Sequence, residues 1–170
     1  MIWLVIGIIV VFFGAVAFIG APYVPSQKKY IRRAFDHFGL NKTDVLIDVG
    51  SGDGIVLRSA AKYGARAVGY EINPFLAGLS RILSRRNPRI QVVLANFWYA
   101  KLPENTTFVY AFSVSRDEKR LTKLLQREAD RLQRPLKLLC YGSPFKDREA
   151  DEKFEAYYLY VFHPLQSKKA

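Results

Sequence analysis

A strand that runs into a glycine-rich turn, at residues 45–54, constrains the fold more strongly than any other stretch. Residues 45–49 are mostly branched apolar strand formers, as a buried central strand of a parallel sheet requires. Glycines at every second position follow, at Gly50, Gly52 and Gly54. They let the backbone turn sharply and lie close to a ligand. A second strand ends in Glu71, about 20 residues further on, where a βαβ nucleotide site places a ribose-binding carboxylate.

The rest of the chain alternates strand and helix patterns. We predict strands over residues 45–49, 65–70, 90–94, 107–112 and 136–141, and helices over 27–38, 54–63 and 74–86. A loop over 96–99 follows the third strand. Asn73 is the expected N-cap of the third helix. Ser115 and Glu118 form a capping box that opens a long amphipathic helix. The aromatic strand 154–162 has no helix before it, so we expect it antiparallel at a sheet edge. The fold class is α/β, with a doubly wound, mostly parallel sheet.

The N-terminal stretch predicts a membrane anchor. Residues 1–27 carry no charged side chain, and residues 2–19 are almost entirely apolar. About 20 such residues in a helix span the hydrocarbon core of a bilayer. We therefore expect a transmembrane helix over 1–21 and one domain over 22–170. The alternative is a buried first helix of a soluble domain.

The position of the first cations predicts the orientation in the membrane. Lys28, Lys29, Arg32 and Arg33 directly follow the apolar stretch. The positive-inside rule then places the domain on the cytoplasmic or mitochondrial matrix side. These cations are suited to meet anionic headgroups, or form a solvated helix face.

The overall charge favours an anionic partner. The chain has 26 basic and 15 acidic residues, for a formal net charge of +11. Such an excess is typical of proteins that contact nucleic acid, an anionic membrane or an acidic protein. The single Cys140 lies in an apolar run and is interpreted as a buried core thiol. His37 and His163 have no partner at metal-ligand spacing, so we expect no metal.

The charges around the glycine turn indicate which ligand it binds. A dinucleotide turn needs a small residue at its third glycine position, where this chain has Ile55. Asp48, Asp53 and Glu71 surround the turn, and carboxylates oppose a negatively charged pyrophosphate. They favour a ligand that carries positive charge and ribose hydroxyls. S-adenosylmethionine, with a sulfonium, an amino group and no phosphate, is such a ligand.

Residues 48–54 resemble the first motif of the class I S-adenosylmethionine-dependent methyltransferases, which have a Rossmann-like fold. Residues 48–81 are more closely similar to the small membrane-anchored protein-lysine methyltransferases, which act on the ATP synthase c-subunit and the adenine nucleotide translocase. That similarity includes the Pro-Tyr-Val-Pro elbow at 22–25 and extends to Phe145. It departs at Asn96 and Phe97, and residues 116–134 match nothing in the family.

The resemblance implies a set of site residues. Glu71 would hold the ribose hydroxyls, and Asn96 would lie near the adenine. The expected cofactor-binding residues are Asp48, Gly50, Ser51, Gly52, Asp53, Gly54, Glu71, Asn73 and Asn96. It also implies an N-methyltransferase whose acceptor is a lysine of a membrane-associated protein.

A lysine acceptor must reach the methyl donor as a neutral amine. An apolar or aromatic channel lowers the pKa of the amine by desolvation. The catalytic residue is not identified by the sequence; the candidates are Asn96, Trp98 and Tyr23, with Phe97 and Tyr99 as further channel walls. Residues 112–115 lack the Asn-Pro-Pro-Tyr motif, which argues against the adenine and glutamine methyltransferases that use it.

Two alternatives remain at this point. The acceptor is a lipid or small molecule, or the chain is a non-catalytic adaptor that binds the cofactor at a membrane. We expect a membrane and a membrane-associated protein as partners, and no nucleic acid.

Overall fold

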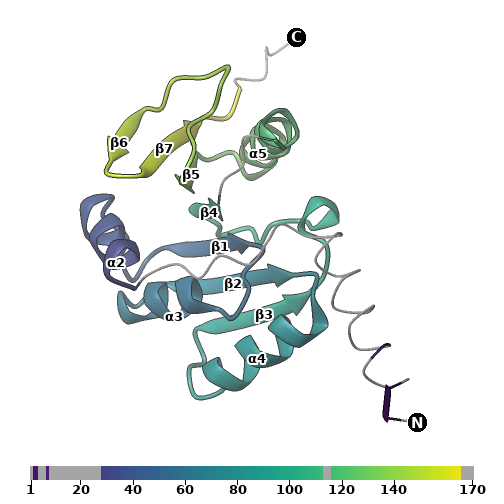
Figure 1. Cartoon of the computed structure of the whole chain (residues 1–170). Helices are drawn as coiled ribbons and strands as arrows, with labels where there is room; N and C mark the ends of the chain where they lie inside the picture. The colour runs from purple at the N-terminus through teal and green to yellow at the C-terminus, as the bar shows by residue number, and fades with distance from the viewer. Residues whose placement is uncertain (1, 4–6, 8–27, 113–115, 166–170) are drawn as a thin grey trace.

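The computed structural model describes residues 2–3, 7, 28–112 and 116–165. Their centre is a seven-stranded sheet in the order β3-β2-β1-β4-β5-β7-β6 (Figure 1). The strands are β1 (Val45–Val49), β2 (Arg66–Glu71), β3 (Ile90–Leu94), β4 (Phe108–Phe112), β5 (Leu136–Tyr141), β6 (Glu152–Phe154) and β7 (Tyr157–Phe162). The first five pair in parallel and the last two antiparallel.

The helices lie on both faces of this sheet. They are α2 (Lys28–His37), α3 (Ile55–Lys62), α4 (Pro74–Ser84) and α5 (Glu118–Leu132), with the short 3-10 helix η1 (Phe97–Tyr99). The predicted α/β class and the mostly parallel sheet are confirmed. The carboxyl ends of β1, β2 and β3 meet at one edge of the fold, because parallel strands point the same way.

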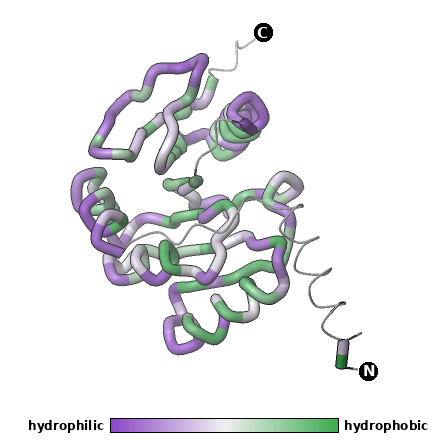
Figure 2. The backbone as a smooth tube through the Cα atoms, viewed as in Figure 1, coloured by the Kyte–Doolittle hydropathy of each residue, from purple (hydrophilic) through white to green (hydrophobic). Residues whose placement is uncertain are grey.

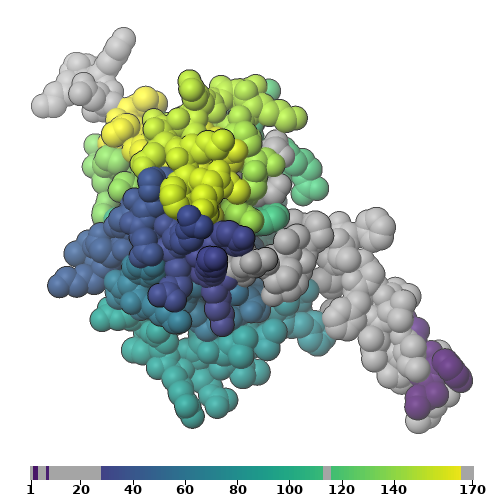
Figure 3. All heavy atoms as spheres, turned by 60° about the vertical axis from the view of Figure 1, so that its left-hand side comes forward, coloured from purple at the N-terminus to yellow at the C-terminus, as the bar shows by residue number. Residues whose placement is uncertain are grey.

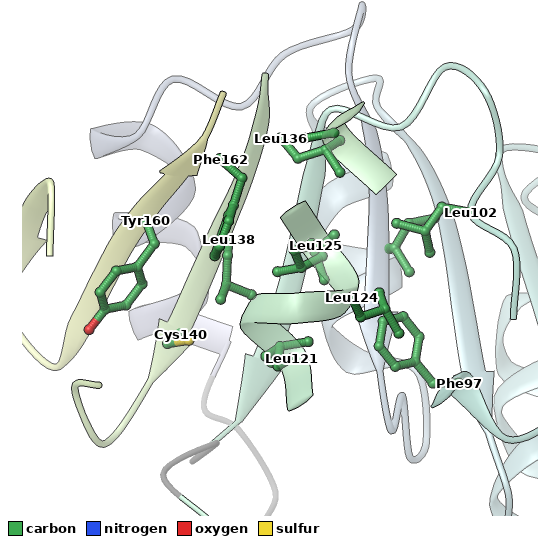
Figure 4. Packing of buried hydrophobic residues seen from close by; sticks show 14 of the residues in the cluster. Phe97, Leu102, Leu121, Leu124, Leu125, Leu136, Leu138, Cys140, Tyr160 and Phe162 are labelled. Carbon is green, nitrogen blue, oxygen red and sulfur yellow. The ribbon is translucent and has the colours of Figure 1, made fainter. Parts of the chain in front are cut away.

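Two apolar clusters hold the helices to the sheet. On one face, Leu121, Leu124 and Leu125 of α5 pack on Leu138 and the other inward residues of the sheet (Figure 4). The opposite cluster joins α2 and α3 to Leu46, Phe108 and Leu159. Cys140 is fully buried in the first cluster, as predicted, and burial raises the pKa of its thiol to about 12.

Helix α2 is held to the C-terminal hairpin rather than standing free. His37 Nε2 lies 2.8 Å from Glu152 Oε1, and its ring stacks on Phe154 at 4.2 Å. Arg33 pairs with Glu155 at 2.7 Å. The helix and hairpin lie together on the surface in Figure 3. Arg33 is exposed, as expected for a solvated helix face, but part of its charge is offset by this carboxylate.

Three local predictions were wrong. The aromatic strand predicted at 154–162 is two strands, because the chain reverses at Glu155 with φ of +54°. The edge strand is therefore β6, while β7 lies between β5 and β6. Residues 97–99, predicted as loop, form η1.

The third wrong prediction is the capping box of Ser115 and Glu118. Helix α5 begins at Glu118 with Asp117 as N-cap, so Glu118 is the first helical residue and not the third. Its carboxylate accepts hydrogen bonds from the backbone N–H groups of Lys146 and Asp147, at 2.7 and 3.0 Å. Ser115 lies outside the described residues.

The predicted transmembrane helix at 1–21 falls almost wholly outside the described residues. Within the described part, no helix is long and apolar enough to cross a membrane.

Candidate cofactor site

The glycine turn after β1 is hydrogen-bonded to the neighbouring strand. The backbone N–H groups of Gly50 and Ser51 both donate to the carbonyl oxygen of Tyr70, at 2.9 and 3.0 Å. The turn then leads to Gly54, which precedes α3 in a left-handed conformation with φ of +81°. The loop therefore lies across the carboxyl ends of β1 and β2, where open α/β sheets bind ligands.

Two glycines are required by close packing. A Cβ on Gly54 would collide with Oγ of Ser80 on α4. A Cβ on Gly69 of β2 would collide with Oγ of Ser51 and lie 2.6 Å from Cδ1 of Leu57. The Ser51 side chain thus points into the strand and is buried, which leaves its backbone to face a ligand. Gly69 was not singled out by the sequence reasoning as a close-packing position, because its partner comes from another element.

Glu71 fixes the turn and faces the site. Its Oε2 accepts a hydrogen bond from the N–H of Gly52 at 2.8 Å, and its Oε1 accepts one from the N–H of Asn73 at 2.8 Å. The residue is 6% exposed. Each carboxylate oxygen has a second lone pair, so the bonds that hold the side chain do not exhaust its capacity for hydroxyl donors.

Asp48 is the most perturbed group of the site. It is 3% exposed, and its neighbours in the sheet register are Gly69 and Tyr110. Burial, reinforced by the charges of Glu71 and Asp53, raises the pKa of Asp48 from 3.8 to about 8. Among the described residues, no hydrogen-bond donor partners this carboxyl. A buried acid without a cation is stabilised by a cationic ligand.

Asp53 contributes less negative charge than the sequence argument supposed. Its Oδ2 pairs with Nη2 of Arg58 at 3.1 Å, and its Oδ1 accepts a hydrogen bond from the N–H of Ile55 at 3.1 Å. Arg58 also donates to the backbone carbonyl of Asp53. The acidic character of the site therefore rests on Asp48 and Glu71. Arg58 was missed, although its place one turn into α3 was a usable signal.

Asn73 and Asn96 have the same local role at two different turns. Asn73 Oδ1 accepts hydrogen bonds from the N–H groups of Phe75 and Leu76 and caps α4, as predicted. Asn96 Oδ1 accepts one from the N–H of Trp98 and caps η1. The structure joins the two segments, since the N–H of Ala95 donates to the carbonyl of Glu71.

The candidate acceptor-side aromatics lie in three different environments. Phe97 is 5% exposed and packs in the core, so a role as channel wall is wrong for it. Trp98 is half-buried, with the guanidinium of Arg120 4.4 Å from its ring. Tyr99 is 83% exposed. Tyr23 lies outside the described residues.

A polar pocket adjoins these aromatics at the start of α5. Its lining residues are Arg116, Asp117, Glu118, Lys119, Arg120, Lys146 and Asp147. The buried Glu118 shapes it by holding the 146–147 backbone. Sequence reasoning missed this pocket because Glu118 was assigned to a capping box. In the described residues no group of His, Cys, Asp or Glu side chains is arranged to hold a metal.

The site therefore matches one kind of ligand in charge and hydrogen bonding. The buried carboxyl of Asp48, which no cation partners, favours a ligand with positive charge, and the carboxylate of Glu71 favours hydroxyl donors. These are the groups of S-adenosylmethionine, so the residues present fit that cofactor.

Comparison with known proteins agrees with this geometry. Residues 20–143 match the sequence model of a family described as ribosomal RNA adenine dimethylase. The chain is 30% identical to the lysine N-methyltransferase of the ATP synthase c-subunit from Xenopus laevis, over 78% of this chain and 58% of that protein. It is 31% identical to a protein-lysine N-methyltransferase of Saccharolobus islandicus, over 63% of this chain and 69% of that protein.

The fold also matches a solved structure. An RNA methyltransferase from Salinibacter ruber, crystallised with S-adenosyl-L-homocysteine, superposes with a TM-score of 0.69 at 23% identity. The match covers 86% of this chain and 98% of the other. The chain spans little more than half the length of the Xenopus relative.

Proposed function

The chain belongs to the S-adenosylmethionine-dependent methyltransferases, because it matches both the ribosomal RNA adenine dimethylase family and a protein-lysine N-methyltransferase. We propose that it methylates a lysine side chain of a membrane-associated protein. The observation that carries the cofactor is the buried pair of Asp48 and Glu71 at the glycine turn. The observation that favours lysine is the set of relatives, several of which are named as lysine N-methyltransferases.

The cofactor would be held at the carboxyl ends of β1 and β2. Asp48 would neutralise its amino group, and Glu71 would accept hydrogen bonds from its ribose hydroxyls. Gly50, Gly52 and Gly54 would present backbone instead of side chains to it. When bound, the cofactor supplies a methyl group activated by a sulfonium, so the protein mainly positions the acceptor in line with it.

The chain's own residues must also deliver a neutral amine. Trp98 follows three residues after Ala95, whose N–H donates to the carbonyl of Glu71, and its apolar ring would desolvate an amine bound against it. Asn96 remains the candidate that orients the amine, with Tyr23 as a further wall. The positive charge of Arg120, 4.4 Å from the Trp98 ring, would also lower the pKa of an ammonium group bound nearby.

The membrane location is part of the proposal. The uncharged residues 1–21 would form a single-pass anchor, with residues 22–170 as one methyltransferase domain on the cytoplasmic or mitochondrial matrix side. An anchor raises the effective concentration of the enzyme near a membrane-embedded acceptor. Several relatives are named for acceptors of this kind, the c-subunit of ATP synthase and the adenine nucleotide translocase.

The test is to incubate the purified chain with membranes and a cofactor labelled in its methyl group. We expect label in protein, and mass spectrometry should place one or more added methylene masses on a lysine. Glu71→Ala should lose labelling, while Glu104→Ala, which removes an exposed acid outside the site, should retain it. Label in the lipid extract with none in protein would refute the lysine acceptor. Glu71→Ala labelling as well as the unaltered chain would refute the cofactor site.

A second acceptor, an adenine base of RNA, is favoured by the family model that matches 20–143. The absence of the Asn-Pro-Pro-Tyr motif at residues 112–115 opposes it. Adding total RNA to the same assay decides between them, because label that is released by ribonuclease would identify RNA as the acceptor.

A further inference from the structure

Helix α4 turns its small residues toward the protein and large apolar residues outward. Its buried positions are Ala77, Ser80 and Ser84. On the opposite side, Leu79 is 44% exposed, Ile82 60% and Leu83 50%. Ile72 and Leu94, 47% and 46% exposed, lie before the helix and at the end of β3. We call these five exposed residues the α4 face, and Figure 2 shows the hydrophobic colour along α4 and β3.

This arrangement is the reverse of an ordinary surface helix, whose apolar stripe faces the core. Close packing explains the inner side, because Ser80 lies against Gly54 and leaves no room for a larger side chain. Packing does not explain the outer side. Large apolar residues that gather on one exposed face mark a site of interaction.

The charged residues of the chain segment that carries the α4 face are all positive. Between Glu71 and Glu104 the chain contains no carboxylate and five cations, at Arg81, Arg85, Arg86, Arg89 and Lys101. Arg81 donates two hydrogen bonds to the carbonyl of Val92 and is held against β3. Arg85 and Arg86 are exposed at the end of the helix. Among the described residues, none of the four arginines forms an ion pair with a carboxylate.

We propose that the α4 face is a docking surface for an anionic lipid bilayer, on which α4 lies in the plane of the interface. An apolar helix face flanked by arginines matches the boundary between acyl chains and anionic headgroups. Nucleic acid would pair with the arginines but leave the apolar residues uncovered. A second copy would cover the apolar residues but bring like charges together, since the same patch meets itself in a two-fold dimer.

The proposal sets the orientation of the domain. Helix α4 begins directly after the turn that holds Glu71, so the cofactor site would lie beside the membrane, with the strand ends pointing along its surface (Figure 1). The inference shares the membrane location with the proposed function, but it does not depend on methyl transfer.

The test uses the full chain with a fluorescent label whose emission reports water or lipid, attached to Ile82→Cys or to Leu165→Cys. Leu165 is a matched control, because it is 66% exposed and apolar but belongs to a different segment. Cys140 is fully buried and does not compete for the label. The labelled chains are reconstituted into vesicles of phosphatidylcholine with phosphatidylglycerol, with and without nitroxide-labelled lipid. Retained binding of S-adenosylhomocysteine shows that each variant is folded.

We expect the label at position 82 to shift to the blue and to be quenched by the nitroxide lipid, while the label at 165 responds to neither. Arg85→Glu with Arg86→Glu should weaken this quenching several-fold, and Lys62→Glu, an exposed charge on α3, should not. Methylation is not measured, so failure here is distinct from failure of the proposed activity.

Three results would overturn the proposal. Emission at position 82 that stays typical of water in anionic vesicles would show that no bilayer covers the face. A blue shift that grows with protein concentration in detergent, without vesicles, would identify a second copy as the occupant. A blue shift in vesicles that the nitroxide lipid does not quench, and that does not depend on protein concentration, would show that the chain covers the face itself.

Discussion

At the scale of single residues, Asp48 shows how a ligand site opposes stability. Its carboxyl is buried and its pKa is raised to about 8, from 3.8 in an unfolded chain. A raised pKa means that the folded state holds the proton more tightly than the unfolded state. In the ligand-free protein, the contribution of Asp48 to the free energy of unfolding is therefore fully present below pH 3.8, and it is lost as the pH rises toward 8. A cationic ligand offsets the loss.

We predict that Asp48→Asn stabilises the ligand-free protein at pH 8. One pKa unit corresponds to about 1.4 kcal/mol, so the gain should reach ~1 kcal/mol or more, or roughly 2–4 °C per kcal/mol in melting temperature. The gain should shrink as the pH falls and vanish below about pH 3, under both pKa values, where the carboxyl is protonated in both states. Thermal melts over this pH range measure it. Asp53→Asn is the control and should destabilise, because it breaks the ion pair with Arg58.

The same group predicts proton release on cofactor binding. If Asp48 is mostly protonated at pH 7 and ionises when it meets a cation, binding of S-adenosylmethionine should release about one proton. Calorimetry in two buffers of different ionisation enthalpy counts that proton. Asp48→Asn should abolish the release and weaken binding by at least 10-fold. Unchanged affinity in this variant would exclude Asp48 from the cofactor site.

Sequence reasoning identified Asp48 and Glu71 because their positions follow from strand ends and spacing. It did not find the roles of Arg58 and Glu118 or the tight contact of Gly69 with Ser51. Each of these depends on which side chain from another turn or strand approaches it, and that is decided by tertiary packing. Phe97 was assigned to a substrate channel for the same reason. A phenylalanine suits both a channel wall and a hydrophobic core, and only the fold decides between them.

At the scale of elements, prediction was accurate where the pattern was strong. Strands β1, β3 and β5 have the predicted bounds, since each is a short and mainly apolar run of strand-forming residues. It failed at the C-terminal hairpin, where Glu155 adopts a left-handed conformation that no glycine or asparagine announced. Sequence reasoning also did not predict that the large apolar residues of α4 face outward, because an apolar stripe on a helix does not show which side packs on the protein.

Two glycine substitutions in neighbouring elements should have opposite effects. Gly69→Ala places a Cβ against Ser51 and Leu57 and should destabilise by about 1–3 kcal/mol. Gly78→Ala in the interior of α4 meets nothing within 4 Å and should stabilise by up to ~1 kcal/mol, because alanine favours a helix more than glycine. Chemical denaturation compares the two. Equal effects would show that β2 accommodates the side chain by moving.

At the scale of the whole molecule, the proposed anchor and the α4 face make different contributions to membrane binding. An apolar transmembrane helix holds a protein regardless of salt, whereas arginines act through electrostatics that is screened within roughly 3 Å at 1 M salt. We predict that the full chain stays on phosphatidylglycerol-containing vesicles in 1 M salt. A chain that lacks residues 1–21 should still bind them at low salt and leave at high salt.

Adding Ile82→Glu and Leu83→Glu to the shortened chain should abolish the remaining binding, because both side chains lie in the exposed α4 face and a buried carboxylate there has no partner. Leu165→Glu is the matched control and should leave binding unchanged. Vesicle flotation measures all four chains. Salt-resistant binding by the shortened chain would show that residues 1–21 are not the anchor. Salt-sensitive binding that survives both glutamate substitutions would show that the second membrane contact is not the α4 face. The cations of α2 would then be the next residues to substitute.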